Sequence, residues 1–259
     1  MLMRSIFIKC LIGLSFILGS GTLSFAEGTE KSALSTFKIK PANTVVELFT
    51  SQGCSSCPPA DVLLEKYVTA PNVIALSYSV DYWDYLGWRD TYGKKANSDR
   101  QRNYARTRGD GSVYTPQAVV NGLEHMNGAS QYKINTKIKE TKQRLSTKLI
   151  KLKFTEIEDK KVRIWSDGAA STQGVVLWMV WVKDKANVAI RRGENRGRTI
   201  AYHNIVLGVE KVADFGRDGV DLTVARDKII PKNGKHCIFL AQVGASGPVL
   251  GALEIKYMP

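Results

Sequence analysis

The sequence has few cysteines and few histidines, and it contains no internal repeat or low-complexity tract. Only four cysteines (Cys10, Cys54, Cys57 and Cys237) and three histidines occur among 259 residues. Four cysteines in a chain of this length are too few for a disulfide framework, so each is interpreted on its own. The hydrophobic content of 44% excludes an intrinsically disordered chain and predicts one large globular domain or two small ones.

Long apolar runs are also missing after the first 26 residues. No later segment has 18 uninterrupted apolar residues, so no stable membrane span is expected there. At the start, Arg4 and Lys9 flank the beginning of a short apolar stretch, and the sequence SFA that ends at residue 26 is typical of a cleavage site. We therefore predict a cleaved signal peptide over residues 1–26 and a periplasmic or secreted location. An uncleaved membrane anchor is the alternative.

Acidic residues are scarcer than basic ones. The chain has 37 Lys and Arg against 24 Asp and Glu, a net charge of +13. Removal of residues 1–26 leaves 35 basic residues against 24 acidic ones, a net charge of +11. The basic residues are spread along the chain without a zinc-finger or aromatic RNA-binding signature, so no nucleic acid partner is expected. We interpret the charge as favouring solubility or loose attraction to anionic envelope surfaces.

The pattern of predicted elements changes near residue 147. Residues 27–44 are polar and are interpreted as a lead-in segment. The following segment predicts the order β-α-β-(α)-β-β-α, with strands at 45–49, 72–80, 117–120 and 124–126 and helices from 58, over 94–108 and from 130 to about 145. The remainder predicts a β-rich domain without a long helix, with strands at 149–154, 162–165, 175–182, 188–191, 222–225, 238–243 and 249–257.

One motif carries chemistry. Cys54 and Cys57 enclose two serines between a predicted strand and a predicted helix that begins with two prolines. Two cysteines at this spacing can close a small disulfide ring, and the N-terminus of a helix favours the thiolate, which is the nucleophile in disulfide exchange. Cys54 would attack or be attacked, and Cys57 would resolve the mixed disulfide. The alternative is a structural disulfide that ties a turn.

Together with a Thr-Pro pair at Thr115 and Pro116, the CSSC motif resembles the thioredoxin superfamily. The longer motifs VVELFTSQGCSSCPPAD, SVDYWDYLGWRD, VYTPQAVVNG and RRGENRGRT closely resemble one family of exported bacterial thioredoxin-like proteins of uncharacterised function. The resemblance covers nearly all of the chain from Val45 onward. It implies a thioredoxin-like α/β domain over residues 45–147 followed by a β-rich, sandwich-like domain over residues 148–259, and it implies no substrate.

The resemblance also implies roles for two residues outside the CSSC motif. Pro116 resembles the cis-proline that lies opposite the cysteines in this superfamily, and a cis bond is accessible mainly before proline. Glu47, on the strand before the motif, resembles the buried acid that moves the proton of the second cysteine; an ion pair is the alternative. The Ser-Ser dipeptide departs from the Gly-Pro of thioredoxin, and a glycine replaces the tryptophan before Cys54. The direction of electron transfer therefore stays open.

The sequence DYWDYLGW follows the second predicted strand and is rich in aromatic residues. If the first two strands are parallel, this segment and the CSSC motif emerge at the same edge of the sheet. Tyr82, Trp83, Tyr85 and Trp88, with Thr115, would then border the cysteines and bind an apolar or peptide substrate. The alternative is that these aromatic residues pack onto their own domain.

Two weaker features complete the set of candidates. The segment RRGENRGR, Arg191–Arg198, can dock an acidic partner or an anionic glycan, but a solvated loop held by internal Arg–Glu pairs is favoured. Cys237, in a predicted strand, is interpreted as an inert buried thiol. A copper or zinc site built from the three remaining cysteines and a histidine lacks a second CxxC or an HxxxH spacing. We therefore predict no metal site and no cofactor.

The leading hypothesis is thiol–disulfide exchange through Cys54 and Cys57 in an exported protein. Its partners would be protein thiols or disulfides of the cell envelope, and no substrate is identified. One alternative is a copper- or zinc-handling metallochaperone that uses the same cysteines. The other is a non-enzymatic binding module of the envelope, in which the disulfide is structural and the aromatic segment and the β-rich domain form the working surface.

Overall fold

The structure is a computed structural model that describes residues 37–168, 172–230 and 236–258. The signal peptide predicted over residues 1–26, and Cys10 within it, lie outside the described residues. None of the helices described has the length and apolar character that a membrane span requires.

The first half of the chain contains the predicted elements in the predicted order. They are β1 (Phe37–Ala42), β2 (Thr44–Thr50), α1 (Pro58–Thr69), β3 (Val73–Ser79), the short 3-10 helix η1 (Asp84–Leu86), α2 (Lys95–Arg108), β4 (Gln117–Val120), β5 (Glu124–Asn127) and α3 (Gln131–Leu145). Local signals account for several boundaries. The Ser130 side chain accepts a hydrogen bond from the Lys133 N–H at the start of α3. Asn121 and Gly122 have positive φ in the turn between β4 and β5. The sequence pattern does not predict β1, which lies in the segment interpreted as a polar lead-in, or η1, which lies in the aromatic segment.

The second half is rich in strands, as predicted. Its elements are β6 (Lys153–Ile157), β7 (Lys161–Trp165), β8 (Val175–Ala189), β9 (Thr199–Asp214), β10 (Asp221–Ala225), α4 (Arg226–Ile229), β11 (His236–Val243) and β12 (Val249–Tyr257). The strands predicted at 175–182 and 188–191 belong to the single strand β8. The sequence pattern does not predict β9, because polar residues and Gly208 interrupt its apolar alternation. Asn204 in this strand has a φ of 46°.

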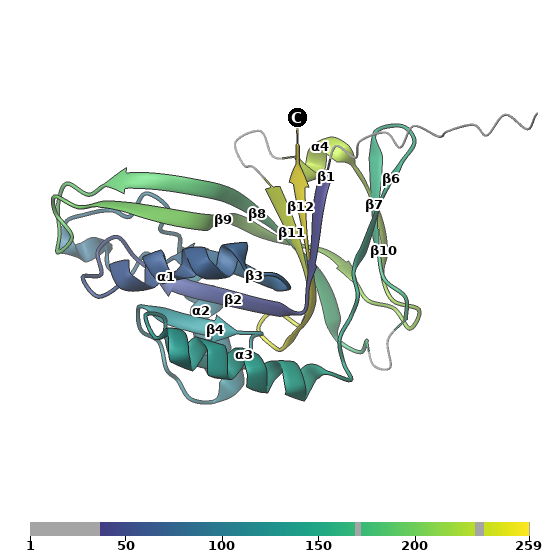
Figure 1. The fold of residues 1–259 in the computed structure, drawn as a ribbon, viewed down its shortest axis with the longest axis horizontal. Helices are drawn as coiled ribbons and strands as arrows, with labels where there is room; N and C mark the ends of the chain where they lie inside the picture. Colours follow the sequence, from purple (N-terminus) through teal and green to yellow (C-terminus); the bar gives the residue numbers. More distant parts are fainter. Residues whose placement is uncertain (1–36, 169–171, 231–235, 259) are drawn as a thin grey trace, which may run out of the picture. The chain divides into compact units, whose positions relative to one another are not determined.

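Nine of the described strands form one mixed sheet in the order β1-β12-β11-β8-β9-β3-β2-β4-β5. The expected fold class, a thioredoxin-like α/β domain followed by a separate sandwich-like domain, is therefore wrong. The long antiparallel hairpin of β8 and β9 makes the sheet continuous, because β9 joins β3 in parallel at the pair Ser77 and Ile205 (Figure 1). The backbone groups at the open edge of β3 need partners, and β9 supplies them. At the other end, β1 pairs with the C-terminal strand β12.

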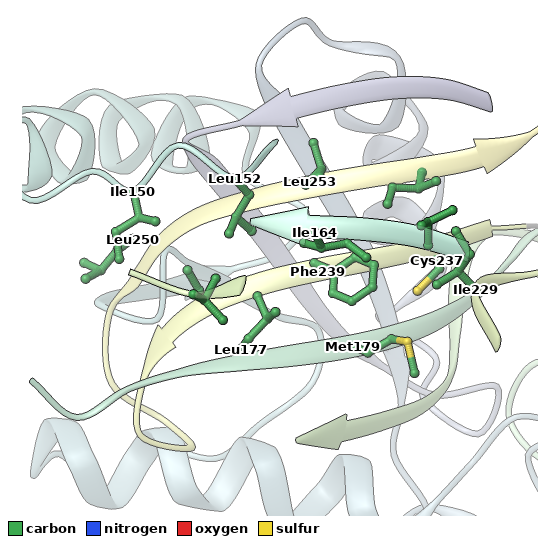
Figure 2. Close-up of a cluster of buried hydrophobic side chains, with 14 of the residues drawn as sticks. Ile150, Leu152, Ile164, Leu177, Met179, Ile229, Cys237, Phe239, Leu250 and Leu253 are labelled. Atoms are coloured by element: carbon green, nitrogen blue, oxygen red, sulfur yellow. The ribbon is translucent and has the colours of Figure 1, made fainter. Parts of the chain in front are cut away.

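The middle of this sheet is buried on both faces. Along β11, Cys237 and Phe239 point to one hydrophobic cluster, whereas Ile238 and Leu240 point to another. The first cluster also receives side chains from the small antiparallel sheet β10-β7-β6, such as Ile164, and Figure 2 shows these side chains between the strands. Burial on both faces explains the continuous apolar sequence of β11.

A buried ion pair joins elements of the two halves of the chain. Glu47 of β2 is fully buried and accepts a hydrogen bond of 2.8 Å from Arg100 Nε of α2. Arg100 also donates to the Tyr104 hydroxyl at 2.8 Å and to Gln242 Oε1 of β11 at 3.1 Å. The Tyr104 hydroxyl in turn donates to the second carboxylate oxygen of Glu47. Each polar atom of Glu47 thus has a partner, as burial of a charge requires.

Candidate functional site

Cys54 and Cys57 form a disulfide bond at the start of α1. Their Cα atoms lie 5.4 Å apart. Cys57 is the N-cap residue, with helical backbone angles, and its carbonyl accepts from the Asp61 N–H at 3.1 Å. Both cysteines are buried, with exposed fractions of 1% and 0%, whereas Ser55 and Ser56 between them are exposed. Reaction at the sulfur atoms therefore requires access beside the two serines.

The loop between β8 and β9 covers the disulfide. We call Arg191–Arg198 the basic loop. The side chain of Asn195, fully buried, donates hydrogen bonds to the carbonyls of Gln52 at 2.9 Å and Cys54 at 2.8 Å. Glu194 accepts a hydrogen bond of 3.2 Å from the Ser55 N–H. The loop is largely exposed, as expected, but the expected internal Arg–Glu pairs are corrected, because Glu194 is bonded to the CSSC segment.

Trp83 connects the CSSC segment to the Thr-Pro pair. A methyl group on Gly53 would lie 3.0 Å from Trp83 Cβ, so the tryptophan packs directly against the residue before Cys54. The indole N–H donates to Thr115 Oγ1 at 2.8 Å. Tyr85 is 77% exposed and stacks on Trp83 with ring centroids 6.4 Å apart. The structure therefore brings these three candidates to the border of the disulfide segment.

The bond between Thr115 and Pro116 is cis. Pro116 lies close to the first turn of α1, because a methyl group on Gly128 would contact both Ala60 Cβ at 3.3 Å and Pro116 Cβ at 3.4 Å. The Gly128 N–H also donates to the Pro116 carbonyl at 3.0 Å. The side chains of Leu48, Ala60 and Pro116 crowd residue 128 and favour glycine there.

Two of the predicted binding aromatics are used for packing. The Tyr82 hydroxyl donates to Gln101 Oε1 at 3.1 Å, and its ring packs against the cluster beneath the sheet. Trp88 donates to Gln52 Oε1 at 2.8 Å and packs against a small cluster that contains Ile190. These contacts agree with the alternative interpretation, in which the segment packs onto its own domain.

Sequence reasoning missed the acid that lies one helical turn after the cysteines. Asp61 follows Cys57 by four residues in α1, and both are buried. Residues at this spacing lie on the same face of a helix with Cβ atoms about 5–6 Å apart, and helical side chains lean towards the N-terminus. The carboxyl group of Asp61 therefore leans towards Cys57. The spacing of four residues is the signal in the sequence that predicts this arrangement.

Burial disfavours the charged form of Asp61. Among the described residues neither of its carboxyl oxygens has a well-formed hydrogen bond, and the side chains of Thr50 and Asp90 are its polar neighbours. Burial raises the pKa of Asp61 well above its usual value, and the charge of Asp90 adds to the shift. Asp90 accepts from the N–H groups of Gln52 and Tyr92, both at 2.8 Å, yet burial raises its pKa to about 6.

Glu47 has the surroundings of a structural acid. Both of its carboxylate oxygens are bonded, to Arg100 and Tyr104, which is the ion pair that the sequence left as the alternative. Cys237 is a free, buried thiol. It packs in the cluster of Figure 2, with Phe239, and burial raises the pKa of its thiol. Within the described ranges, no group of three or more potential metal ligands is found.

The comparison with protein families gives one match, over residues 45–242, to a family described as a protein of unknown function (DUF1223). The chain belongs to the DUF1223 family. A crystal structure of a protein from Agrobacterium tumefaciens is 30% identical to this DUF1223 protein, covers 84% of this chain and 95% of its own, and has a TM-score of 0.71. Curated protein sequences contain no match.

A second solved structure shows the fold alone. HBP35 of Porphyromonas gingivalis is 15% identical to this DUF1223 protein, and the match covers 84% of this chain and 76% of HBP35 with a TM-score of 0.56. The family assignment agrees with the resemblance to an uncharacterised family that the sequence motifs indicate, and its description names no activity.

Proposed function

We propose that this DUF1223 protein carries out thiol–disulfide exchange through Cys54 and Cys57, with protein thiols or disulfides of the cell envelope as its partners. The observation that supports this most is a disulfide at the start of a helix with a buried acid of raised pKa one turn behind it. Burial of the Asp61 carboxyl group without hydrogen-bond partners lowers the stability of the fold. A purely structural disulfide does not explain why this acid is buried there. Persistence of the disulfide favours an oxidising compartment, which supports a periplasmic or secreted location.

In the disulfide form the protein accepts two electrons. A substrate thiolate attacks Sγ of Cys54, the sulfur–sulfur bond breaks, and Cys57 leaves with the electron pair. A second substrate thiolate then attacks the substrate sulfur of the mixed disulfide, and Cys54 leaves as a thiolate that the N-terminus of α1 stabilises. The substrate is oxidised to a disulfide and the protein is reduced to a dithiol. The same steps in reverse reduce a substrate disulfide.

Asp61 supplies the proton that Cys57 needs in this sequence. Burial raises the pKa of its carboxyl group and so favours the protonated form, which can donate to the departing Cys57 thiolate. In the reverse direction the carboxylate accepts the proton of the Cys57 thiol before that sulfur attacks Cys54. Asp61 takes the role that the sequence resemblance implied for Glu47.

A redox titration of residues 27–259 tests the exchange function. The protein is equilibrated in graded thiol–disulfide buffers and alkylated, and the state of each cysteine is read by mass. We expect a midpoint potential for Cys54 and Cys57 between about −120 and −270 mV, the span of known oxidoreductases. A pair that stays oxidised below about −300 mV would identify a structural disulfide and would favour the binding-module hypothesis.

The proton role of Asp61 has a separate test. In Asp61→Asn we expect the reduction of the disulfide by a dithiol to slow at least about a hundredfold at neutral pH, because general acid catalysis is lost. The pH profile of the rate should also lose one inflection. Glu65→Gln, which changes an exposed acid farther along the same helix, is the matched control and should keep the wild-type profile. An Asp61→Asn profile identical to that of the wild type would exclude the proton transfer.

A further inference from the structure

The basic loop concentrates positive charge beside the disulfide. Asn195 and Glu194 are bonded to the CSSC segment, so their neighbours in the loop lie against the same segment. Backbone hydrogen bonds between Ile190 and Arg198, at 2.9 Å, and between Arg196 and Gly193, at 3.1 Å, close the loop tightly. Its arginines therefore remain close to the exposed serines that separate the two cysteines.

All four arginines of the loop, at 191, 192, 196 and 198, are exposed. In the described part of the chain, none of them is paired with a carboxylate; Arg198 contacts only the side-chain amide oxygen of Asn195, at 3.3 Å. Arg89, next to Trp88, is exposed as well. Of the acids nearby, Asp61 and Asp90 are buried, Glu194 is bonded to Ser55, and Asp84 is bonded to the Asp90 N–H at 3.0 Å. The border of the disulfide thus carries an uncompensated positive charge.

We infer that the basic loop selects partners whose reacting cysteine lies in an acidic segment. This inference rests on the proposed exchange function and names the class of its substrate. Arg192 and Arg196 are the specificity-determining residues, since they are exposed and unpaired and lie within two residues of Glu194 and Asn195, which contact the CSSC segment. Guanidinium groups bind carboxylates through paired, charge-assisted hydrogen bonds, so acidic residues beside a cysteine would bind here while its thiolate approaches Cys54. Complementary charge also speeds the encounter of the two chains.

Three synthetic peptides of equal length test the inference. Each carries one cysteine, flanked by two aspartates, two serines or two lysines, and the rate at which each reduces the disulfide is corrected for its thiolate fraction. At low ionic strength we expect the acidic peptide to react about tenfold faster than the lysine peptide. The ratio should fall towards one in 0.5 M salt, because salt screens exposed charges over a few ångströms.

Two double variants isolate the loop. Arg192→Gln with Arg196→Gln should lower the ratio between the acidic and the lysine peptide to about threefold at low salt, because half of the loop arginines are neutralised. Lys139→Gln with Lys142→Gln removes the same charge from exposed positions of α3 and should leave the ratio unchanged.

The outcomes separate the two proposals. If the serine peptide reduces the disulfide but all three peptides react at equal rates, the substrate class is wrong and the exchange function stands. A ratio that falls equally in both double variants also overturns the inference, because net charge alone would then explain it. If no peptide and no small dithiol reacts, the exchange function fails and this inference fails with it.

Discussion

We predict that Glu47 is a structural residue that pairs with the buried cation of Arg100. The variant Glu47→Gln tests this role. Glutamine keeps the shape of the side chain and one acceptor oxygen but removes the negative charge. Arg100, with 8% of its surface exposed, is then a buried cation without its anion. Removal of one partner of such a pair destabilises proteins by about 3–5 kcal/mol, a large part of the usual total of about 5–15 kcal/mol.

Urea unfolding, followed by tryptophan fluorescence with the disulfide intact, measures this loss. With a slope of about 3 kcal/mol per molar urea, the midpoint of Glu47→Gln should fall by about 1–2 M. The double variant Glu47→Leu with Arg100→Met should recover most of the loss, because no charge is then left buried and unpaired. The recovery separates the charge effect from a defect in packing.

A catalytic Glu47 would give a different result. The midpoint potential of Cys54 and Cys57 in Glu47→Gln should equal that of the wild type, since Arg100 and Tyr104 already bind both carboxylate oxygens. A loss of stability below about 1 kcal/mol, together with slower disulfide exchange, would refute the reasoning and return Glu47 to the exchange chemistry.

Three further predictions follow from single residues. Asp90, whose pKa rises from 3.8 to about 6 on folding, holds its proton more tightly in the folded state, so stability should fall by about 2 kcal/mol as pH rises from 4 to 6. Unfolding measured at several pH values should show a flatter dependence in Asp90→Asn; equal slopes would contradict this origin. Asn195→Ala removes two buried hydrogen bonds, so the free energy of unfolding should fall by about 1–3 kcal/mol. Reduction of Cys54 by a neutral dithiol should also become faster in this variant. An unchanged rate would show that the basic loop does not limit access to the disulfide. Gly251→Ala would place a methyl group 2.0 Å from the Ile150 carbonyl oxygen, and thermal unfolding should show a loss of about 1–3 kcal/mol; an unchanged melting temperature would exclude the clash.

Several parts of the candidate site can be predicted from the sequence. The CSSC motif between an apolar strand and two prolines indicates a disulfide at a helix N-terminus, and the structure confirms that pair. The Thr-Pro pair at residues 115 and 116 is found in the cis form that its resemblance implies. These features depend on residues that are adjacent in the sequence, or on motifs several residues long. They can therefore be predicted from sequence patterns.

The residues that complete the site were predicted wrongly or not at all. Asn195 contacts Cys54 across more than a hundred residues of chain, and the sequence of its loop favours a solvated segment. Asp61 has a local signal, its spacing from Cys57, but its burial depends on the strands packed over α1. The sequence alone does not show that Glu47 pairs with Arg100. Without this partner, a structural ion pair cannot be distinguished from a catalytic acid.

The same division explains the error in fold class. Apolar periodicity reports which residues form a strand, because a strand must bury one face or both. It does not report which strand lies beside which, since backbone hydrogen bonds are the same for every residue type except proline. By itself the sequence determined the strand, helix and disulfide around Cys54 and the strand-rich character of the second half. Only the tertiary structure decided that β9 pairs with β3, that one sheet joins the two halves, and that a basic loop covers the disulfide, because these contacts link segments far apart in the chain.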